Sequence, residues 1–529
     1  MSGPGRGAGP LPKRPRSTAH DIERYAALFA ERTKVMKSSA MRDLMALTER
    51  DDVISLAGGM PDTSTFPPDS YASVMRTVAV DSCAKALQYS PTEGLALVKS
   101  CILQVMLAEG MDVDPDELLV TTGGQQVIDL VCKTLVDPGD VVVTEAPTYP
   151  GAVPTFCAYQ ADVVQVMMDR DGMRVDELEQ TLDELERSGR RPKFIYTVPN
   201  FHNPAGVTMS LERRERLVQI AGERELLVLE DNPYGLLRYE GTPLPTLHSL
   251  DDEFIIYAST FSKILSPGVR LGWACAPAPV LSKMNIGKQA SDLCSSSISQ
   301  HFVGAYFESG PWQDYVLSLI EIYRRRRDVM LDALAEHFPR EAEWTHPQGR
   351  LFIWATLPDY IDTTDLLARA LEEHVAFVPG RAAFVDGRGG SSMRLNFSGA
   401  DEDEIREGIR RIGEVVREQV ALYGTLTGVS QAQRRVARPP AERPVTSQAP
   451  DATAASTPSD PELAKVLKLP AQRSRATGGT AAGAAPVSVP YRPTCSRTTL
   501  PMRRMPSRMS STPTPEKFSR IDEPPRPSR

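Results

Sequence analysis

The most regular hydrophobic pattern in this sequence is a series of short apolar runs that alternate with amphipathic stretches. Each run is about five residues long and rich in Val, Ile and Leu. The runs occupy residues 118–122, 141–144, 163–167, 194–198, 226–230 and 254–258. Strands that are apolar on both faces are typical of a parallel sheet covered by helices on both sides. We therefore predict an α/β fold with a mainly parallel central sheet.

Helical periodicity occupies the stretches between these runs. Residues 175–186 illustrate it, with apolar side chains at Val175, Leu178, Leu182 and Leu185. This spacing places them on one helix face, which can cover a sheet. The alternation of strand and helix indicates that ligands bind beyond the carboxyl ends of the strands.

From about residue 311 the pattern changes. A long helical stretch, 312–337, leads to shorter strands near 351–355 and 392–397, and a helix at 401–422 follows. The last helix carries a single apolar stripe, and this part of the chain predicts a second, smaller α+β domain. The arginine run at 324–327 within the long helix is expected to form a solvated face.

Both ends of the chain differ from this body. The first residues are rich in Gly, Pro and Arg, and the last hundred or so are dominated by Pro, Ser, Thr, Ala and Arg. Such segments bury too little apolar surface to offset the entropy of ordering them. The predicted division is a disordered arm at 1–19, a segment joining the small domain at 20–60, a large domain at 61–310, a small domain at 311–424 and a disordered tail at 425–529.

Composition narrows the class of protein. The 529 residues are 41% hydrophobic and 24% charged, which is globular composition with room for two domains. A net charge of −8 gives no electrostatic reason to expect a nucleic-acid partner. The seven cysteines are scattered, with no Cys-x-x-Cys pair, so neither a disulfide framework nor a metal site is expected.

No stretch of the sequence approaches 18 continuous apolar residues, so we expect no membrane-spanning helix. The basic N-terminus lacks the apolar region of a secretory signal. The expected location is the cytoplasm.

Polar side chains follow three successive apolar runs, where the predicted strands end. They comprise an amide, a carboxylate, a phenol, two hydroxyls, an amine and a guanidinium: Asn203, Asp231, Tyr234, Thr260, Ser262, Lys263 and Arg270. Because the carboxyl ends of parallel strands share one edge of a sheet, we expect these side chains to lie close together.

This set suits a cofactor that carries an aldehyde, a pyridine ring and a phosphate. Lys263 supplies an amine for the aldehyde. An ionised Asp231 keeps a ring nitrogen protonated. Asn203 and Tyr234 can donate hydrogen bonds to a ring phenolate oxygen, and Tyr149 can stack on the ring.

The phosphate of such a cofactor needs hydroxyls, backbone amides and a fixed cation. Thr260 and Ser262 supply hydroxyls, and Arg270 supplies the cation. Gly124 and Gln125 belong to a glycine-containing turn that follows a predicted strand and opens a predicted helix. The amides at such a helix N-terminus favour an anion.

The body of the chain, roughly residues 21–423, resembles the fold-type I, class I/II aminotransferases, in particular the branch of 2-aminoadipate, kynurenine and aromatic aminotransferases. Asn203-Pro204-x-Gly206, Asp231-x-x-Tyr234 and Ser262-Lys263, with Arg270 seven residues on, match that family in order and spacing. Ser-Leu-Ala-Gly-Gly at 55–59 and Leu-Gln-Tyr-Ser at 87–90 also match.

The resemblance implies a pyridoxal 5′-phosphate enzyme with the cofactor bound to Lys263. It would move an amino group between an L-amino acid and a 2-oxo acid by a ping-pong mechanism, with Lys263, Asp231 and Tyr234 as its catalytic residues. The resemblance also implies a homodimer with shared active sites, because Tyr89 matches a tyrosine that reaches the phosphate of the other subunit.

The resemblance assigns substrate-binding roles to four further positions. Arg394 matches the arginine that clamps the substrate α-carboxylate, for which a bidentate guanidinium is well suited. Asn203 would help to hold the same carboxylate, and Gly59 would lie close to the substrate. Arg42 matches an arginine that approaches the substrate side chain.

Two positions depart from the family pattern. Arg350 stands in Pro347-Gln348-Gly349-Arg350 where a second small residue is usual. We expect it to point to solvent, with the pocket as the alternative. Gly124 stands where relatives often carry serine, so one hydroxyl donor is absent there.

Two other classes of function remain open at this point. One is a different reaction on the same scaffold, as in a β-lyase, a decarboxylase or a racemase, since a fold does not fix a reaction. The other is a non-catalytic, regulatory aminotransferase-like protein. The identity of the substrate and the role of the tail are not indicated by the sequence.

Overall fold

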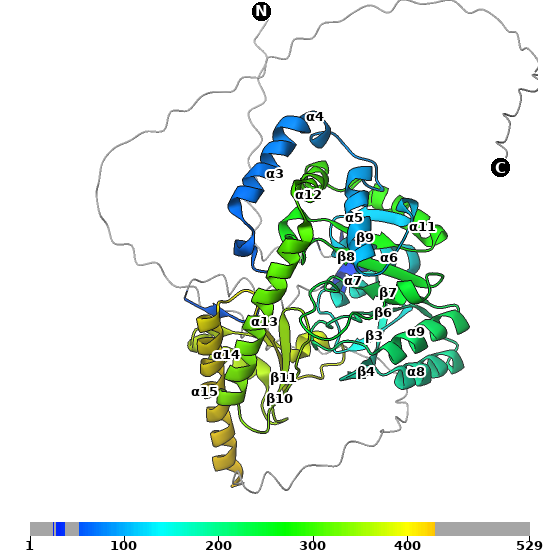
Figure 1. The fold of residues 1–529 in the computed structure, drawn as a ribbon. Helices are drawn as coiled ribbons and strands as arrows, with labels where there is room; N and C mark the ends of the chain where they lie inside the picture. Colours follow the sequence, from blue (N-terminus) through cyan, green and yellow to red (C-terminus); the bar gives the residue numbers. More distant parts are fainter. Residues whose placement is uncertain (1–24, 26–27, 37–51, 429–529) are drawn as a thin grey trace, which may run out of the picture. The chain divides into compact units, whose positions relative to one another are not determined.

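The computed structural model describes residues 25, 28–36 and 52–428, which all fall within one structural unit (Figure 1). The predicted division into a large and a small domain stays a prediction, and the predicted arm at 1–19 and most of the tail lie outside the described residues. None of the described helices is both long and apolar enough to cross a membrane.

An eight-stranded sheet forms the centre of the fold. Its strands lie in the order β2 (Leu118–Thr121), β9 (Gly272–Cys275), β8 (Ile255–Thr260), β7 (Leu227–Asp231), β6 (Pro192–Thr197), β3 (Val141–Ala146), β4 (Asp162–Asp169) and β5 (Gly172–Met173). The strands from β8 to β4 pair in parallel, whereas β9 and β5 run antiparallel to their neighbours. The predicted α/β fold with a mainly parallel sheet is confirmed.

Alternate residues of the parallel strands face two separate hydrophobic cores. One core receives Val142, Phe194, Leu229 and Ile256, together with side chains of α6 (Gly124–Leu135), α7 (Val153–Ala158) and α11 (Ala278–Ser291). The other receives Val143, Ile195, Val228 and Ile255, together with side chains of α8 (Val175–Arg187), α9 (Leu211–Glu223) and α10 (Leu247–Leu250). Because both faces are covered, consecutive strand residues are apolar on both faces, which produced the continuous runs in the sequence.

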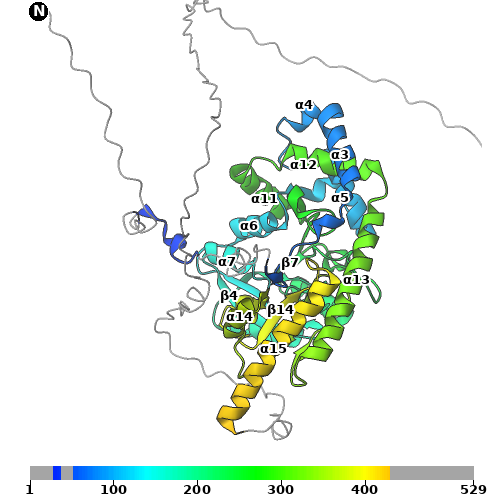
Figure 2. The ribbon, with the colours of Figure 1, turned by 90° about the vertical axis from the view of Figure 1, so that its left-hand side faces the viewer.

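A smaller antiparallel sheet lies in the C-terminal part of the fold. It has the order β10 (Glu343–Trp344), β11 (Phe352–Thr356), β14 (Ser392–Asn396) and β13 (Val378–Pro379), and α14 (Thr363–Glu372) follows β11 in sequence. The long helices α13 (Trp312–His337) and α15 (Glu402–Thr427) pack side by side in both views (Figures 1 and 2). β1 (Ile54–Ser55) pairs in parallel with β12 (Val375–Ala376), so a segment near the N-terminus joins this part of the chain.

The remaining elements precede or connect these two sheets. They are the α-helices α3 (Pro68–Asp81), α4 (Cys83–Ala86), α5 (Ala96–Ala108) and α12 (Ser297–Ser309), and the 3₁₀ helices at Glu31–Lys34, Thr63–Thr65, Pro115–Glu117, Pro267–Val269 and Gly380–Ala383.

Candidate active site

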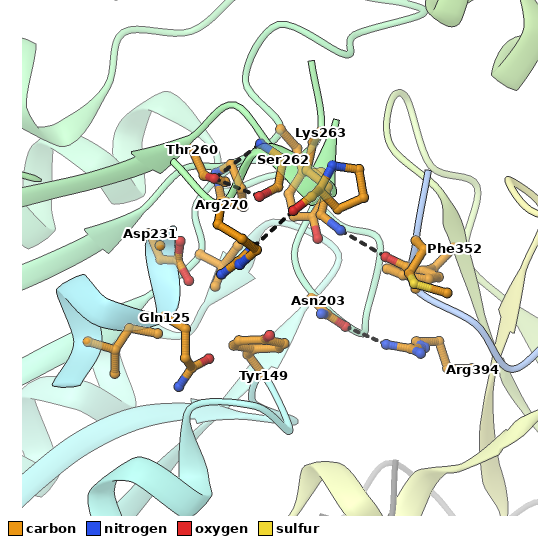
Figure 3. Close-up of a pocket in the computed structure, with 18 residues that line it drawn as sticks. Gln125, Tyr149, Asn203, Asp231, Thr260, Ser262, Lys263, Arg270, Phe352 and Arg394 are labelled. Atoms are coloured by element: carbon orange, nitrogen blue, oxygen red, sulfur yellow. Dashed lines mark hydrogen bonds between the residues drawn. The ribbon is translucent and has the colours of Figure 1, made fainter. Parts of the chain in front are cut away.

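The polar side chains that follow β6, β7 and β8 line one cavity of about 270 Å³ (Figure 3). Twelve of the fourteen predicted site residues line it: Gly59, Gly124, Gln125, Tyr149, Asn203, Asp231, Tyr234, Thr260, Ser262, Lys263, Arg270 and Arg394. Asp231 and Arg394 lie on opposite sides of the drawn cavity in Figure 3. The cavity therefore sits at the carboxyl ends of the parallel strands, as the α/β pattern predicts.

Lys263 follows β8 and is the cavity's only lysine among the described residues. Its Nζ donates a hydrogen bond to the carbonyl oxygen of Gly59 at 2.9 Å. Burial lowers the pKa of Lys263, and the nearby cations Arg350 and Arg394 act in the same direction. A lower pKa leaves more of the amine neutral, which is the form that attacks an aldehyde.

Asp231 ends β7 and is buried, with 9% of its surface exposed. The hydroxyl of Tyr196 donates a hydrogen bond of 2.6 Å to its Oδ2. Burial raises the pKa of Asp231 to about 6, while Tyr196 and Arg350 oppose that rise. A cationic ring nitrogen placed against this carboxylate would restore its ionised form.

Tyr196 is a site residue that the sequence analysis missed. It lies inside the apolar run that became β6, and its ring is fully buried, so the pattern indicated only a core residue. A buried tyrosine hydroxyl needs a hydrogen-bond partner, and this requirement was the available signal.

The turn between β2 and α6 is closely packed against β9. Gly123 has φ +80°, and a Cβ there would come within 2.3 Å of Arg270 Nη2. A Cβ at Gly272 would come within 2.7 Å of the backbone of Gly123 and Gly124. Both positions therefore require glycine, and the first residues of α6 present their backbone amides at the cavity.

The hydroxyls and the cation beside this turn are held in place. The oxygens of Thr260 and Ser262 lie 2.8 Å apart, and Thr260 donates to the carbonyl oxygen of Leu271. Arg270 donates to the carbonyl oxygens of Thr122 and Pro267 at 3.2 Å each. Two hydroxyls, a guanidinium and a helix N-terminus form a suitable phosphate site.

A second set of residues supports the same turn from behind. Asp292 accepts hydrogen bonds from Thr122, Gln126 and the fully buried Lys288. These contacts join two helices and the turn. The local sequence did not indicate those from Thr122 and Gln126, because both residues are more than 150 positions from Asp292.

Arg394 lies on β14, is buried and lines the cavity. Its Nη1 donates to Asn203 Oδ1 at 3.2 Å, and its Nη2 donates to the carbonyl oxygens of Ala57 and Gly58. Burial lowers its pKa to about 9, and the neighbouring Arg350 contributes. A buried guanidinium near a second cation favours an anionic ligand.

Arg350 does not point to solvent, so that expectation is wrong. Its side chain is completely buried, and its Nη2 donates to the Tyr234 hydroxyl at 3.1 Å. Its guanidinium carbon lies 3.8 Å from the centre of the Tyr234 ring and 4.6 Å from that of Phe352. Aromatic faces stabilise the guanidinium, which explains how the charge is accommodated without water.

The arginine run at 324–327 is also only partly solvated. Arg326 pairs with Asp62 at 3.0 Å, and Arg327, with 6% of its surface exposed, pairs with Glu240. Arg324 and Arg325 lie on the exposed face of α13. The expectation of a solvated helix face holds for the first two arginines and is wrong for the other two.

The other two predicted site residues are Tyr89 and Arg42. Tyr89 has 77% of its surface exposed in the single chain, so its predicted contact with another subunit stays a prediction. Arg42 lies outside the described residues. Across residues 52–428 and the short described segments before them, no group of His, Cys, Asp and Glu side chains could hold a metal ion.

The chemistry of the lining residues fits pyridoxal 5′-phosphate. Lys263, Arg270 and Arg394 supply three cations, whereas Asp231 is the one carboxylate among the described lining residues. This excess of positive charge suits a phosphate together with a substrate carboxylate. An amine, a carboxylate for a ring nitrogen and phenolic donors complete the set.

Comparison with known protein families gives a match over residues 51–412 to the family described as aminotransferase class I and II. The chain is 42% identical over 402 residues to aromatic-amino-acid aminotransferase 1 of Thermococcus litoralis, covering 76% of this chain and 96% of that protein. It is 36% identical over 402 residues to 2-aminoadipate transaminase of Thermus thermophilus, covering 75% of this chain and 98% of that protein.

Among solved structures, the kynurenine aminotransferase of Pyrococcus horikoshii, in complex with PMP, superposes with a TM-score of 0.72. The two chains are 40% identical, and the match covers 76% of this chain and 98% of the other.

Proposed function

Because the chain belongs to the aminotransferase class I and II family, we propose that the cavity at Lys263 is its active site. The chain is a pyridoxal-phosphate-dependent aminotransferase, which moves an amino group between an amino acid and a 2-oxo acid. The observation that carries the proposed site is the convergence of Lys263, Asp231 and Arg394 on one cavity.

Lys263 is the proposed catalytic residue. When bound, pyridoxal phosphate supplies an electron sink for the amino acid and holds the amino group between the two half-reactions. Lys263 would hold the cofactor through its aldehyde. Its amine is placed to take the Cα proton of the amino acid as general base and to return a proton as general acid. Its lowered pKa favours the neutral amine that this role requires.

Asp231 and Tyr234 hold the cofactor ring in its reactive state. The carboxylate of Asp231 would pair with the ring nitrogen and keep it protonated. The hydroxyl of Tyr196 donates to Asp231, and the hydroxyl of Tyr234, which lines the cavity, would donate to the ring oxygen. Thr260, Ser262, Arg270 and the amides of Gly124 and Gln125 bind the phosphate.

Arg394 and Asn203 orient the substrate. They lie in hydrogen-bond contact, and Arg394 can accept a carboxylate in a bidentate pair. Gly59 leaves space beside them, since a Cβ there would come within 3.5 Å of Arg394 Nη2. Fixing the carboxylate aims the Cα–H bond of the substrate at Lys263.

The proposed donors are amino acids with large side chains, including aromatic amino acids, kynurenine and 2-aminoadipate. The named relatives act on these substrates, and Met60, Ile128, Val198 and Phe352 add apolar surface to the cavity. Apolar walls with a few polar groups favour large side chains over small ones.

A half-reaction screen tests this proposal. Purified holoenzyme is mixed with one amino acid at a time, without an acceptor, and the products are separated. We expect stoichiometric pyridoxamine phosphate and 2-oxo acid with phenylalanine, kynurenine or 2-aminoadipate, and at least tenfold slower conversion of alanine. Release of ammonia or CO₂, or a preference for alanine, would contradict it.

The proposed assembly is a cytoplasmic homodimer. Tyr89 and Leu87 are exposed large side chains near a surface depression at residues 292–298, which suits burial against a second copy. The free cysteines of the described part, of which Cys101, Cys132 and Cys275 are buried, suit a reducing compartment.

A further inference from the structure

Arg350 is a buried cation behind the wall of the active site. It does not line the cavity, yet it contacts Tyr234, which does. Its Nη1 donates to the carbonyl oxygen of Phe201, and its ring contacts with Tyr234 and Phe352 leave its side chain 0% exposed. Several independent contacts therefore fix the guanidinium in one orientation.

The backbone at Arg350 indicates that this side chain is retained against a local cost. Its φ is +77°, in the left-handed region where a residue with a Cβ is strained and glycine is favoured. Such a conformation persists where the surrounding contacts enforce it, and it points to a role for the side chain. The position is also one where the family resemblance leads us to expect a small residue.

The hydrogen bond between Arg350 and Tyr234 can run in one direction only. A guanidinium has N–H donors and no acceptor, so the Tyr234 oxygen must accept this bond. The single hydroxyl hydrogen of Tyr234 is therefore free to be donated elsewhere. Because Tyr234 lines the cavity and is 4% exposed, the available direction is into the cavity.

We propose that Arg350 is a positioning residue that fixes the Tyr234 hydroxyl as a hydrogen-bond donor toward the ring oxygen of pyridoxal phosphate. The proposal rests on the proposed function of the cavity. Arg350 touches neither substrate nor cofactor and acts through Tyr234.

Other charged groups around Tyr234 set the electrostatic background. Lys263 Nζ lies 5.9 Å from the centre of its ring, and Asp231, Tyr149 and Arg394 line the same cavity. Asp231 is the one carboxylate in this group, and it is already bonded to Tyr196. Arg350 forms no ion pair with Asp231 in the described contacts, although the two charges lie near enough to interact. The hydrogen bond that Arg350 donates strengthens the Tyr234 hydroxyl as a donor.

In the holoenzyme, the linkage between the Lys263 amine and the cofactor aldehyde would carry a titratable proton. A stronger donor at the ring oxygen would change the pKa of this linkage. Donation from Tyr234 disfavours an additional proton on the nitrogen that joins Lys263 to the cofactor, and the charge of Arg350 acts through the same hydroxyl. Removal of Arg350 should therefore let the linkage hold its proton to higher pH. The visible absorbance of the holoenzyme reports this titration without any substrate.

The test compares the absorbance titration of holoenzyme variants. Arg350→Met removes the donor and the charge, and Arg350→Gly also relieves the strained backbone, which protects against misfolding. We expect both to raise the titration midpoint by about one pH unit, the size expected from losing one charged hydrogen-bond partner. Tyr234→Phe should cause a similar rise, and adding Arg350→Met to it should cause little more, because the two residues act as one unit.

Arg238→Met is the matched control. The guanidinium carbon of Arg238 lies 4.7 Å from the centre of the Phe201 ring, and no described hydrogen bond joins Arg238 to Tyr234. The titration midpoint of Arg238→Met should therefore equal that of the wild type. Arg350 variants with wild-type midpoints and normal unfolding temperatures, or fully additive shifts with Tyr234→Phe, would overturn the proposal. A wild-type protein without any Lys263-dependent absorbance would instead overturn the proposed function.

Discussion

Asp231 shows, at the scale of one residue, how a residue of the proposed cofactor site can destabilise the folded protein. Its carboxylate is buried, and burial is the largest cause of its raised pKa. Without a cationic ring beside it, the ionised carboxylate is less stable at this buried position than it is in water. Residues that serve a ligand commonly reduce the stability of the unliganded protein.

The variant Asp231→Asn tests this directly. Because the folded state raises the pKa of Asp231 from 3.8 to about 6, the fold favours the protonated form. The ionised carboxylate therefore costs stability above about pH 6, up to roughly 3 kcal/mol, and costs nothing below about pH 4. Urea unfolding of the cofactor-free proteins should show the variant to be the more stable at pH 7 and the two to be equal at pH 4.

The same change should lower turnover of the holoenzyme by about 10- to 100-fold, since a charged hydrogen bond to the ring nitrogen is lost. Asp112→Asn, at an exposed position after α5, is the control and should alter neither quantity. Equal stability of the wild type and Asp231→Asn at pH 7 would contradict the account of Asp231.

Residue types that carry the chemistry could be predicted, whereas the residues that support them could not. Lys263, Asp231 and Arg394 have reactive or charged side chains, and the motifs that contain them follow a recognisable order along the chain. Tyr196 is hidden in an apolar run, and the burial of Arg350 depends on Phe201 and Tyr234, which are more than 100 residues away. Such contacts become visible only in the folded chain.

At the scale of elements, the turn between β2 and α6 is the most constrained part of the site. The main chain of β9 approaches it so closely that Gly272 excludes a Cβ, and the side chain of Arg270 excludes one at Gly123. Arg270, itself at φ +50°, packs into the space beside Gly123. The turn can thus present its amides and the arginine to one phosphate.

Gly123→Ala should weaken cofactor binding, because its Cβ would meet Arg270 Nη2 at 2.3 Å and displace it. Gly189→Ala is the matched control, with φ +72° and nothing within 4 Å of the added Cβ. Both changes should cost about 1 kcal/mol of stability through the backbone. Equilibrium titration with pyridoxal phosphate should show at least tenfold weaker binding for Gly123→Ala alone, and equal affinities of the two variants would contradict this.

The strands were predictable because two buried faces leave a continuous apolar run. The run at 194–198 became β6 and that at 226–230 became β7, with ends shifted by one or two residues. β9 was not predicted, since it has four residues and its antiparallel place between β2 and β8 depends on distant partners. The order of strands in the sheet was likewise not indicated by the sequence.

At the scale of the whole molecule, the site combines both sheets of one chain. Asp231 ends β7 of the central sheet and Lys263 follows β8 of the same sheet, whereas Arg394 lies on β14 of the smaller one. Any rearrangement between the two sheets would therefore change the distance from Arg394, the proposed substrate clamp, to Lys263, the proposed catalytic lysine. The proposed dimer adds Tyr89 from a second copy.

Hybrid dimers test the shared site. In a dimer of one Lys263→Ala chain and one Tyr89→Ala chain, the site that retains Lys263 would receive an intact Tyr89 from its partner. Co-expressed hybrids, purified by two different tags, should therefore be more active per dimer than either parent. Hybrid activity no greater than half that of the Tyr89→Ala dimer would indicate that each chain uses its own Tyr89 or none.

The most direct test of the central claim is chemical trapping of the cofactor on its lysine. The purified holoenzyme is reduced with borohydride, which makes the bond between an amine and the cofactor permanent, and its peptides are mapped by mass spectrometry. The account predicts a phosphopyridoxyl group on Lys263 of the wild type and none in Lys263→Ala. Attachment to a different lysine, or none in an active wild-type enzyme, would contradict it.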